Sequence, residues 1–91
     1  MLDEIARPQI RSDVQYRELS DGAVVYDTAA ERVHTLNITA AYIWNCCDGS
    51  HSLDDIAVEL LSQVDIAREK ALADVRDAIT YFQAEGLLQP Q

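Results

Sequence analysis

Leu36 to Ser50, with the sequence LNITAAYIWNCCDGS, contains a strand end, a short apolar helix and a glycine stop in succession. Beyond Asn37 the apolar residues recur at spacings of three and four, which is the pattern of one helical face. Asn37 and Thr39 are both suitable N-cap residues, and Gly49 is suited to ending the helix. The sequence therefore predicts a short buried helix whose core face contains Ala40, Ile43, Trp44 and Cys47.

Strand-like segments precede this helix. Residues 14–18 alternate polar and apolar side chains, residues 23–26 are apolar, and residues 32–36 follow after a short connection. The turn Ser20-Asp21-Gly22 and the connection 27–31 are each short enough for a hairpin. These patterns predict three antiparallel strands.

Two further helices are predicted downstream. Ser52 is an N-cap residue followed three positions later by Asp55, an arrangement related to the capping box. The third helix is expected to begin between Asp65 and Glu69 and to end at Gly86. The core stripe of the second helix is Leu53, Ile56, Ala57, Leu60, Leu61 and Val64, and that of the third is Leu72, Val75, Ile79 and Phe82.

Three antiparallel strands followed by three helices make a winged helix-turn-helix-like fold of the α+β class. The 91 residues are enough for one small domain, which we place at residues 14–91. Residues 1–13 have no clear period and contain Arg7-Pro8, so we expect an N-terminal arm that is mobile or only loosely docked. In this fold Trp44 and Phe82 should be buried between the first and third helices.

The charge of the chain argues against nucleic acid as a partner. The formal net charge is -9, from 16 acidic and 7 basic residues, and Lys70 is the single lysine. Binding to phosphates needs clustered Lys and Arg side chains. A winged-helix transcriptional regulator is therefore only an alternative function. The exposed face of the third helix mixes charges of both signs: Arg68, Glu69, Lys70, Asp74, Arg76, Asp77 and Glu85.

The sequence also bears on the compartment. No apolar stretch is long enough to span a membrane, and Met1 to Glu4 contains acids where a secretion signal has a basic start. The two cysteines are adjacent and cannot build a disulfide framework. We expect a cytoplasmic protein that does not associate with membranes.

No set of residues predicts an enzyme or a metal site. Cys46 and Cys47 are consecutive on a helix, so their side chains diverge by about 100° and do not easily share a tetrahedral metal with His51. Cys47 is expected in the core with Cys46 partly shielded, and His34 is expected at the surface or in strand pairing. We therefore expect no enzymatic activity, no metal and no cofactor.

Several short motifs together are similar to those of a known family. They are Leu36-Asn37, Cys47-Asp48-Gly49, Ser52-Leu53-Asp54-Asp55-Ile56, Asp74-Val75 and Gly86-Leu87-Leu88. From about Val24 to Leu88 the chain resembles the pyrroloquinoline quinone biosynthesis protein D (PqqD) family. The resemblance implies a small winged-helix module that binds the leader of a ribosomally made precursor peptide and presents it to a modifying enzyme.

The resemblance leaves the pathway open. Pyrroloquinoline quinone members tend to end the last helix in Gly-Trp-Leu, where this chain has Gly86-Leu87-Leu88. Leader-binding proteins of lasso peptide pathways carry an arrangement similar to Leu36-Asn37 and Ile43-Trp44. The expected partners are thus a precursor peptide and a peptide-modifying enzyme, either a radical SAM enzyme or a leader peptidase.

A peptide-binding surface is expected at the edge of the sheet. An edge strand has unpaired N–H and C=O groups that can accept an extended peptide as a further strand. The resemblance implies the same place, with the leader paired to the third strand and packed against the last helix. On this sequence the ladder would run from Arg32 to Asn37, through Val33, His34, Thr35 and Leu36.

Spacing places a second line of residues on the third helix, beside its core stripe. This line is Ala71, Asp74, Ala78 and Tyr81, and its two alanines would leave room for the side chains of a bound strand. The alternative is that these alanines are simply good helix formers. A homodimer formed through the same strand edge is an alternative use of the surface.

Overall fold

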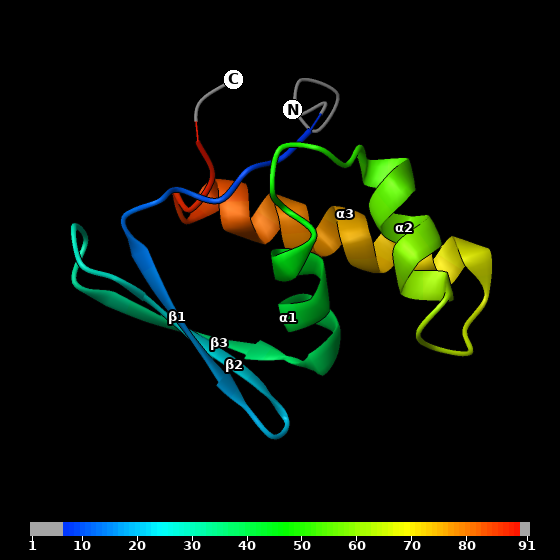
Figure 1. The fold of residues 1–91 in the computed structure, drawn as a ribbon, viewed down its shortest axis with the longest axis horizontal. Coiled ribbons are helices and arrows are strands. Elements are labelled where there is room, and N and C mark those ends of the chain that lie inside the picture. Colours follow the sequence, from blue (N-terminus) through cyan, green and yellow to red (C-terminus); the bar gives the residue numbers. More distant parts are fainter. Residues whose placement is uncertain (1–6, 90–91) are drawn as a thin grey trace.

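The computed structural model describes residues 7–89, which form a three-stranded sheet followed by three helices (Figure 1). The strands are β1 (Val14–Leu19), β2 (Gly22–Asp27) and β3 (Arg32–Asn37). The helices are α1 (Ile38–Asn45), α2 (Leu53–Leu61) and α3 (Arg68–Ala84). This order confirms the expected α+β, winged helix-turn-helix-like fold. Met1 to Glu4, which bear on the expectation about secretion, lie outside the described residues.

The sheet is antiparallel with the order β1-β2-β3, so β3 is an edge strand. Gly22 pairs with Leu19 of β1 on one side and with Asn37 of β3 on the other. Its φ is 150°, and a Cβ atom at this position would clash with the carbonyl oxygen of Leu36. Glycine is therefore required where the first hairpin turns beside the end of β3.

α1 begins directly after β3 because Asn37 belongs to both elements. Its side chain accepts a hydrogen bond from the backbone N–H of Ala40 at 2.8 Å, so Asn37, and not Thr39, is the N-cap. The helix ends at Asn45, and the expectation that Gly49 stops it is wrong. Gly49 instead lies beside the N-terminal segment, where its N–H donates to the carbonyl oxygen of Pro8 at 3.1 Å.

α2 begins, and α3 both begins and ends, where the sequence predicts. α2 ends at Leu61, however, so Val64 of its expected core stripe lies beyond the helix. A capping box joins Ser52 and Asp55, with each side chain accepting a hydrogen bond from the other residue's N–H. After α3 the chain passes through Gly86 at a φ of 72°. It then turns back, and the N–H of the fully buried Leu87 donates to the carbonyl oxygen of Phe82 at 2.9 Å.

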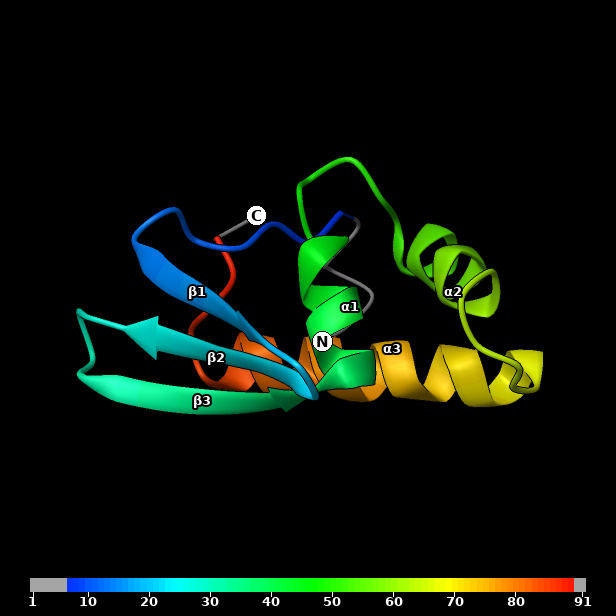
Figure 2. The same ribbon diagram turned by 60° about the horizontal axis from the view of Figure 1, so that its bottom comes forward.

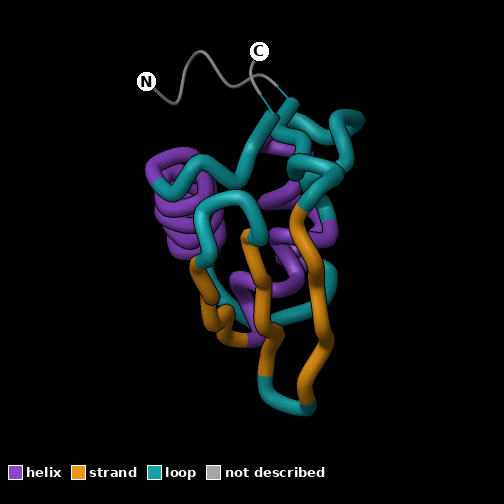
Figure 3. Tube along the Cα trace, turned by 90° about the vertical axis from the view of Figure 1, so that its left-hand side faces the viewer, coloured by secondary structure: helices purple, strands orange, loops and turns teal. Residues whose placement is uncertain are grey.

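The core lies between one face of the sheet and the helices. In Figure 3 one helix is seen nearly end-on beside the strands, and other helical segments lie behind them. Trp44 and Phe82 are 6% and 0% exposed, and their rings meet edge to face with centroids 5.1 Å apart. This confirms that they are buried between α1 and α3. The buried face of α3 begins at Ala71, whereas Leu72 is only partly buried, so the expected core stripe is off by one residue at the start of the helix.

The expectation of a mobile or loosely docked arm is wrong for residues 8–13. The backbone N–H of Ile10 donates to the carbonyl oxygen of Cys47, and that of Arg11 donates to the carbonyl oxygen of Leu87, both at 3.0 Å. The backbone N–H of Gln89 donates to the carbonyl oxygen of Gln9 at 2.8 Å. The segment is therefore hydrogen-bonded both to the loop after α1 and to the chain that follows α3. Its residues before Arg7 lie outside the described part.

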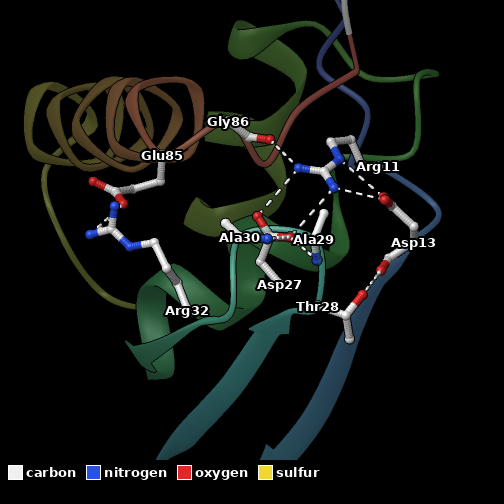
Figure 4. Close-up of polar contacts among 9 residues, drawn as sticks. All are labelled: Arg11, Asp13, Asp27, Thr28, Ala29, Ala30, Arg32, Glu85 and Gly86. Atoms are coloured by element: carbon white, nitrogen blue, oxygen red, sulfur yellow. Dashed lines mark hydrogen bonds and ion pairs between the residues drawn. The ribbon is translucent and has the colours of Figure 1, made fainter.

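The Arg11 side chain adds a second attachment for this segment (Figure 4). Its guanidinium donates to the Gly86 carbonyl oxygen and to Asp13, both at 2.7 Å, and to Asp27 at 3.3 Å. Asp27 is only 1% exposed, and its carboxylate also accepts hydrogen bonds from Ala29 and Ala30 in the β2–β3 turn. One arginine therefore joins the N-terminal segment, the β2–β3 hairpin and the end of α3.

Candidate functional site

The outer edge of β3 is open. β3 pairs with β2 on one side, and in the part of the chain that the structure describes no strand pairs with its other side. The side chains alternate along the strand, with His34 and Leu36 buried and Val33 and Thr35 exposed. The open edge therefore offers backbone N–H and C=O groups at every second residue.

Figure 2 shows α3 at the level of β3, on the opposite side of the sheet from β1. A groove lies between the end of β3 and one flank of α3. No Cα atom of β3 comes within 8 Å of one in α3. The groove has a volume of about 570 Å³. Its lining comes from the end of β3, the first turns of α1 and one flank of α3: Thr35, Leu36, Asn37, Thr39, Ala40, Ile43, Lys70, Asp74, Asp77, Ala78, Tyr81 and Phe82.

Five of the nine residues proposed from the sequence line this groove. They are Thr35, Leu36, Asp74, Ala78 and Tyr81. On the helix, three of the four residues in the expected flank are therefore brought together with the end of the strand.

The fourth helix residue, Ala71, does not belong to the groove. Its side chain is fully buried in the core, so the expectation that it leaves space for a bound side chain is wrong. The physical reason is that Ala71 lies on the same buried face of α3 as Val75, Ile79 and Phe82. Along β3, Val33 is 63% exposed and lies outside the groove lining.

Sequence reasoning missed the contribution of α1 to the groove. Ala40 and Ile43 form part of its apolar lining, and Thr39 lies at the start of the same helix. The helical spacing assigned Ala40 and Ile43 to the core. It gave no sign that the same two residues also line a groove. The direct passage from β3 into α1 at Asn37 was the signal that these residues lie next to the strand edge.

An ion pair lies near each end of the α3 flank that lines the groove. Lys70 Nζ lies 2.8 Å from Asp74 Oδ1, and this hydrogen bond raises the pKa of Lys70. Near the far end of α3, Arg32 Nη2 lies 3.2 Å from Glu85 Oε1, and the two side chains point toward one another in Figure 4. The acidic residues of this flank outnumber its single lysine, so its rim favours a neutral or basic ligand.

His34 and Tyr81 make a direct contact between β3 and α3. His34 is 3% exposed, and its Nδ1 lies 2.8 Å from the Tyr81 hydroxyl oxygen. Of the two expected placements for His34, the surface is wrong, whereas strand pairing is confirmed by its pairing with Val25 of β2. The sequence placed His34 in the strand correctly, but its side-chain partner lies 47 residues away and has no local signal.

Asp48, Ser50 and His51 have the composition of a catalytic triad but not its geometry. Asp48 Oδ1 accepts hydrogen bonds from Ser50 Oγ at 2.6 Å and from His51 Nδ1 at 3.0 Å, and Ser50 Oγ lies 3.2 Å from the same Nδ1. A triad histidine instead uses one nitrogen for the acid and the other for the nucleophile. The hydrogen bonds from Ser50 hold the pKa of Asp48 well below its usual range, and Asp48 raises the pKa of His51.

The cysteines are core residues. Cys46 and Cys47 are 9% and 4% exposed, and burial raises the pKa of Cys47 to about 12. The Cys47 thiol also donates to the carbonyl oxygen of Ile43 at 3.2 Å. Within residues 7–89, no group of three His, Cys, Asp or Glu residues is placed to hold a metal ion. No helix in the same range is long and apolar enough to cross a membrane.

Two solved structures are similar to this fold. One is described as TbiB1 in complex with the TbiA(beta) leader peptide, with a TM-score of 0.79, 17% identity, and coverage of 91% of this chain and 96% of that chain. The other is described as lasso peptide synthetase B1 complexed with the leader peptide, with a TM-score of 0.80, 27% identity, and coverage of 93% and 100%.

Sequence comparison gives a consistent result. No curated protein matches the chain. The family model described as coenzyme PQQ synthesis protein D (PqqD) matches residues 22–88, from the start of β2 to the end of the segment that follows α3. The matched range contains β3, α1 and α3, which together line the groove. The chain therefore belongs to the PqqD family.

Proposed function

We propose that this protein binds the leader of a ribosomally made precursor peptide as a fourth strand on β3 and presents it to a modifying enzyme. The observation that carries this proposal is the open edge of β3 facing a groove whose far wall is α3. The protein acts as a recognition element in the cytoplasm. It contributes no catalytic group, metal or cofactor of its own.

The dimensions of the groove suit an extended peptide. A strand added to a sheet lies about 4.8 Å from its neighbour and rises about 3.3 Å per residue. The groove of about 570 Å³ lies between the end of β3 and one flank of α3, which is where the added strand would lie. β3 has six residues, which can pair with a peptide segment of similar length.

The lining of the groove provides selectivity that the backbone ladder lacks. Side chains on one face of the added strand would contact Ala40, Ala78 and the ring of Tyr81, which are lining residues that keep some exposed surface. Polar groups of the peptide would meet Thr35 and the rim of α3. We expect the leader to combine small or medium apolar side chains with a neutral or basic character.

Solved structures of similar fold support this proposal, because both are described as complexes with a leader peptide. The partner enzyme is either a leader peptidase, as expected for a lasso peptide pathway, or a radical SAM enzyme. The more similar of the two structures by identity is described as a lasso peptide synthetase component, which favours the lasso pathway.

Calorimetry with the leader of the precursor peptide encoded beside this chain tests the proposal. Ala78→Trp fills the groove and should weaken binding at least tenfold, because an indole ring takes the space of the peptide side chains. The matched control is Ala73→Trp, which places the same ring on an exposed position of the same helix outside the groove. The control should bind as the wild type does.

Hydrogen exchange adds a direct test of the strand pairing. Alternate backbone N–H groups of β3 point away from β2 and should become protected when the leader binds. The measurement should be made under conditions where gel filtration shows a monomer, because pairing of two β3 edges in a homodimer would also protect these groups. Tight leader binding that leaves the β3 amides unchanged and survives Ala78→Trp would refute the proposed site.

A further inference from the structure

The buried contact between His34 and Tyr81 has one unsatisfied atom. His34 Nδ1 lies 2.8 Å from the Tyr81 hydroxyl oxygen, and the two rings meet edge to face with centroids 5.8 Å apart. The other ring nitrogen, Nε2, is buried and has no hydrogen-bond partner among the described residues. The position of the imidazole proton therefore decides which buried group stays unpaired.

A neutral imidazole has one N–H donor and one bare acceptor nitrogen. If the proton were on Nε2, the pair would contain a buried N–H without an acceptor. If the proton is on Nδ1, the unpaired atom is a bare acceptor. Buried donors without partners are rarer in proteins than under-satisfied acceptors, so the tautomer with the proton on Nδ1 is favoured. In that tautomer His34 donates to the oxygen of Tyr81, which leaves the hydroxyl hydrogen of Tyr81 free.

Tyr81 is placed to use this hydrogen in the groove. The residue is 42% exposed and is part of the groove lining. Its ring is held by an edge contact with the buried Phe82 as well as by His34. Among the described residues the Tyr81 hydroxyl has no hydrogen-bond partner other than His34. Its second hydrogen-bonding position is therefore available to a ligand.

We infer that Tyr81 is a specificity-determining donor to the bound peptide and that His34 is the positioning residue that sets the direction of its hydroxyl. The inference rests on the proposed function. The group recognised is a neutral carbonyl oxygen of the peptide, in its main chain or in an Asn or Gln side chain. A carboxylate is disfavoured because Asp74 and Asp77 line the same flank of α3.

Two kinds of measurement test the inference. Nitrogen NMR of the His34 ring in the wild-type protein should show the proton on Nδ1, both alone and with the leader bound. Tyr81→Phe keeps the ring and removes the hydroxyl, so it should weaken leader binding by about 2- to 12-fold, the range of one neutral hydrogen bond. The control Tyr26→Phe removes a hydroxyl from a half-exposed tyrosine of β2 outside the groove, and it should change nothing.

A double-mutant cycle separates positioning from simple packing. His34→Leu should weaken leader binding, but it should have no further effect in the Tyr81→Phe background, because the hydroxyl that it positions is already absent. Alanine substitution of each Asn and Gln of the leader distinguishes the two sources of the carbonyl oxygen. A Tyr81→Phe effect that persists with every substituted leader identifies the main chain.

The outcomes are distinguishable from failure of the proposed function. If the wild type bound no leader, the proposed function and this inference would both fall. If the wild type bound the leader tightly and Tyr81→Phe bound it equally well, this inference alone would be overturned. A His34 proton on Nε2 would overturn it too, even if His34→Leu proved too unstable to measure.

Discussion

Replacing Phe82 by alanine should remove a central aromatic ring of the core and leave the exposed residues of the protein unchanged. Phe82 is fully buried, and its ring meets Trp44 of α1 and Tyr81 of its own helix edge to face. Its backbone carbonyl oxygen accepts a hydrogen bond from Leu87, and the substitution keeps this bond. Loss of the ring leaves a cavity between α1 and α3.

The expected loss of stability is large for a domain of this size. Truncation of a buried phenylalanine costs about 3 to 5 kcal/mol, and edge-to-face ring contacts bring the value toward the upper part of that range. Small domains have a free energy of unfolding of about 5 to 15 kcal/mol. With a urea m-value of about 1 to 3 kcal/mol per molar, the unfolding midpoint should fall by at least about 1 M.

Urea unfolding followed by Trp44 fluorescence measures this shift, because the single tryptophan lies against the missing ring. The matched control is Tyr26→Ala, which truncates an aromatic residue on a half-exposed position of β2 and should cost less than about 1 kcal/mol. Equal midpoints for Phe82→Ala and the wild type would show that α3 does not present this face to the core.

The other predictions concern the strand edge, a buried thiol and a polar turn. Proline at Thr35 should abolish the protection of β3 amides by the leader, as seen by hydrogen exchange, because the edge is distorted and one backbone N–H is removed; unchanged protection would contradict strand addition. Cys47 should resist thiol reagents at pH 8 in the native state, because burial raises its pKa to about 12, and fast labelling before unfolding would contradict its core position. Asp48 raises the pKa of His51 above its usual 6.5, so His51 stabilises the fold fully below about pH 6.5 and loses this effect as the pH rises through the raised value. Unfolding midpoints of the wild type and His51→Asn should therefore converge between pH 6 and pH 9, and a constant difference would contradict the interaction.

The sequence predicted the order of the elements and the starts of the helices, because these starts carry local signals. Ser52 and Asp55 close a capping box through neighbouring backbone groups, and the Gly86 turn follows from the residues beside it. The sequence did not determine where the core stripe of α3 starts, because Ala71 and Leu72 are adjacent and both apolar. In the folded protein Ala71 is in the core and Leu72 is only partly buried, and this difference depends on tertiary packing with residues distant in sequence.

The N-terminal segment and the groove show a different limit. Residues 8–11 dock through backbone hydrogen bonds, which leave no periodic pattern of side chains in the sequence. The partners of the Arg11 side chain, Asp27 and Gly86, are distant in sequence and come close to it only in the folded protein. Three residues of the expected flank of α3 do line a groove beside β3. The contribution of α1 to this groove depends on how three elements meet, and the pattern of a single helix does not reveal it.

The order in which the groove walls are made has a consequence during synthesis. β3 ends at Asn37, whereas Phe82 and the flank of α3 come later in the chain. At a translation rate of about 5 to 20 residues per second, roughly 2 to 9 s separate these two points. In that interval the nascent chain exposes a strand edge without the helix that faces it and without the ring at the centre of its core. At the proposed site, a leader therefore meets both walls only after α3 has been completed.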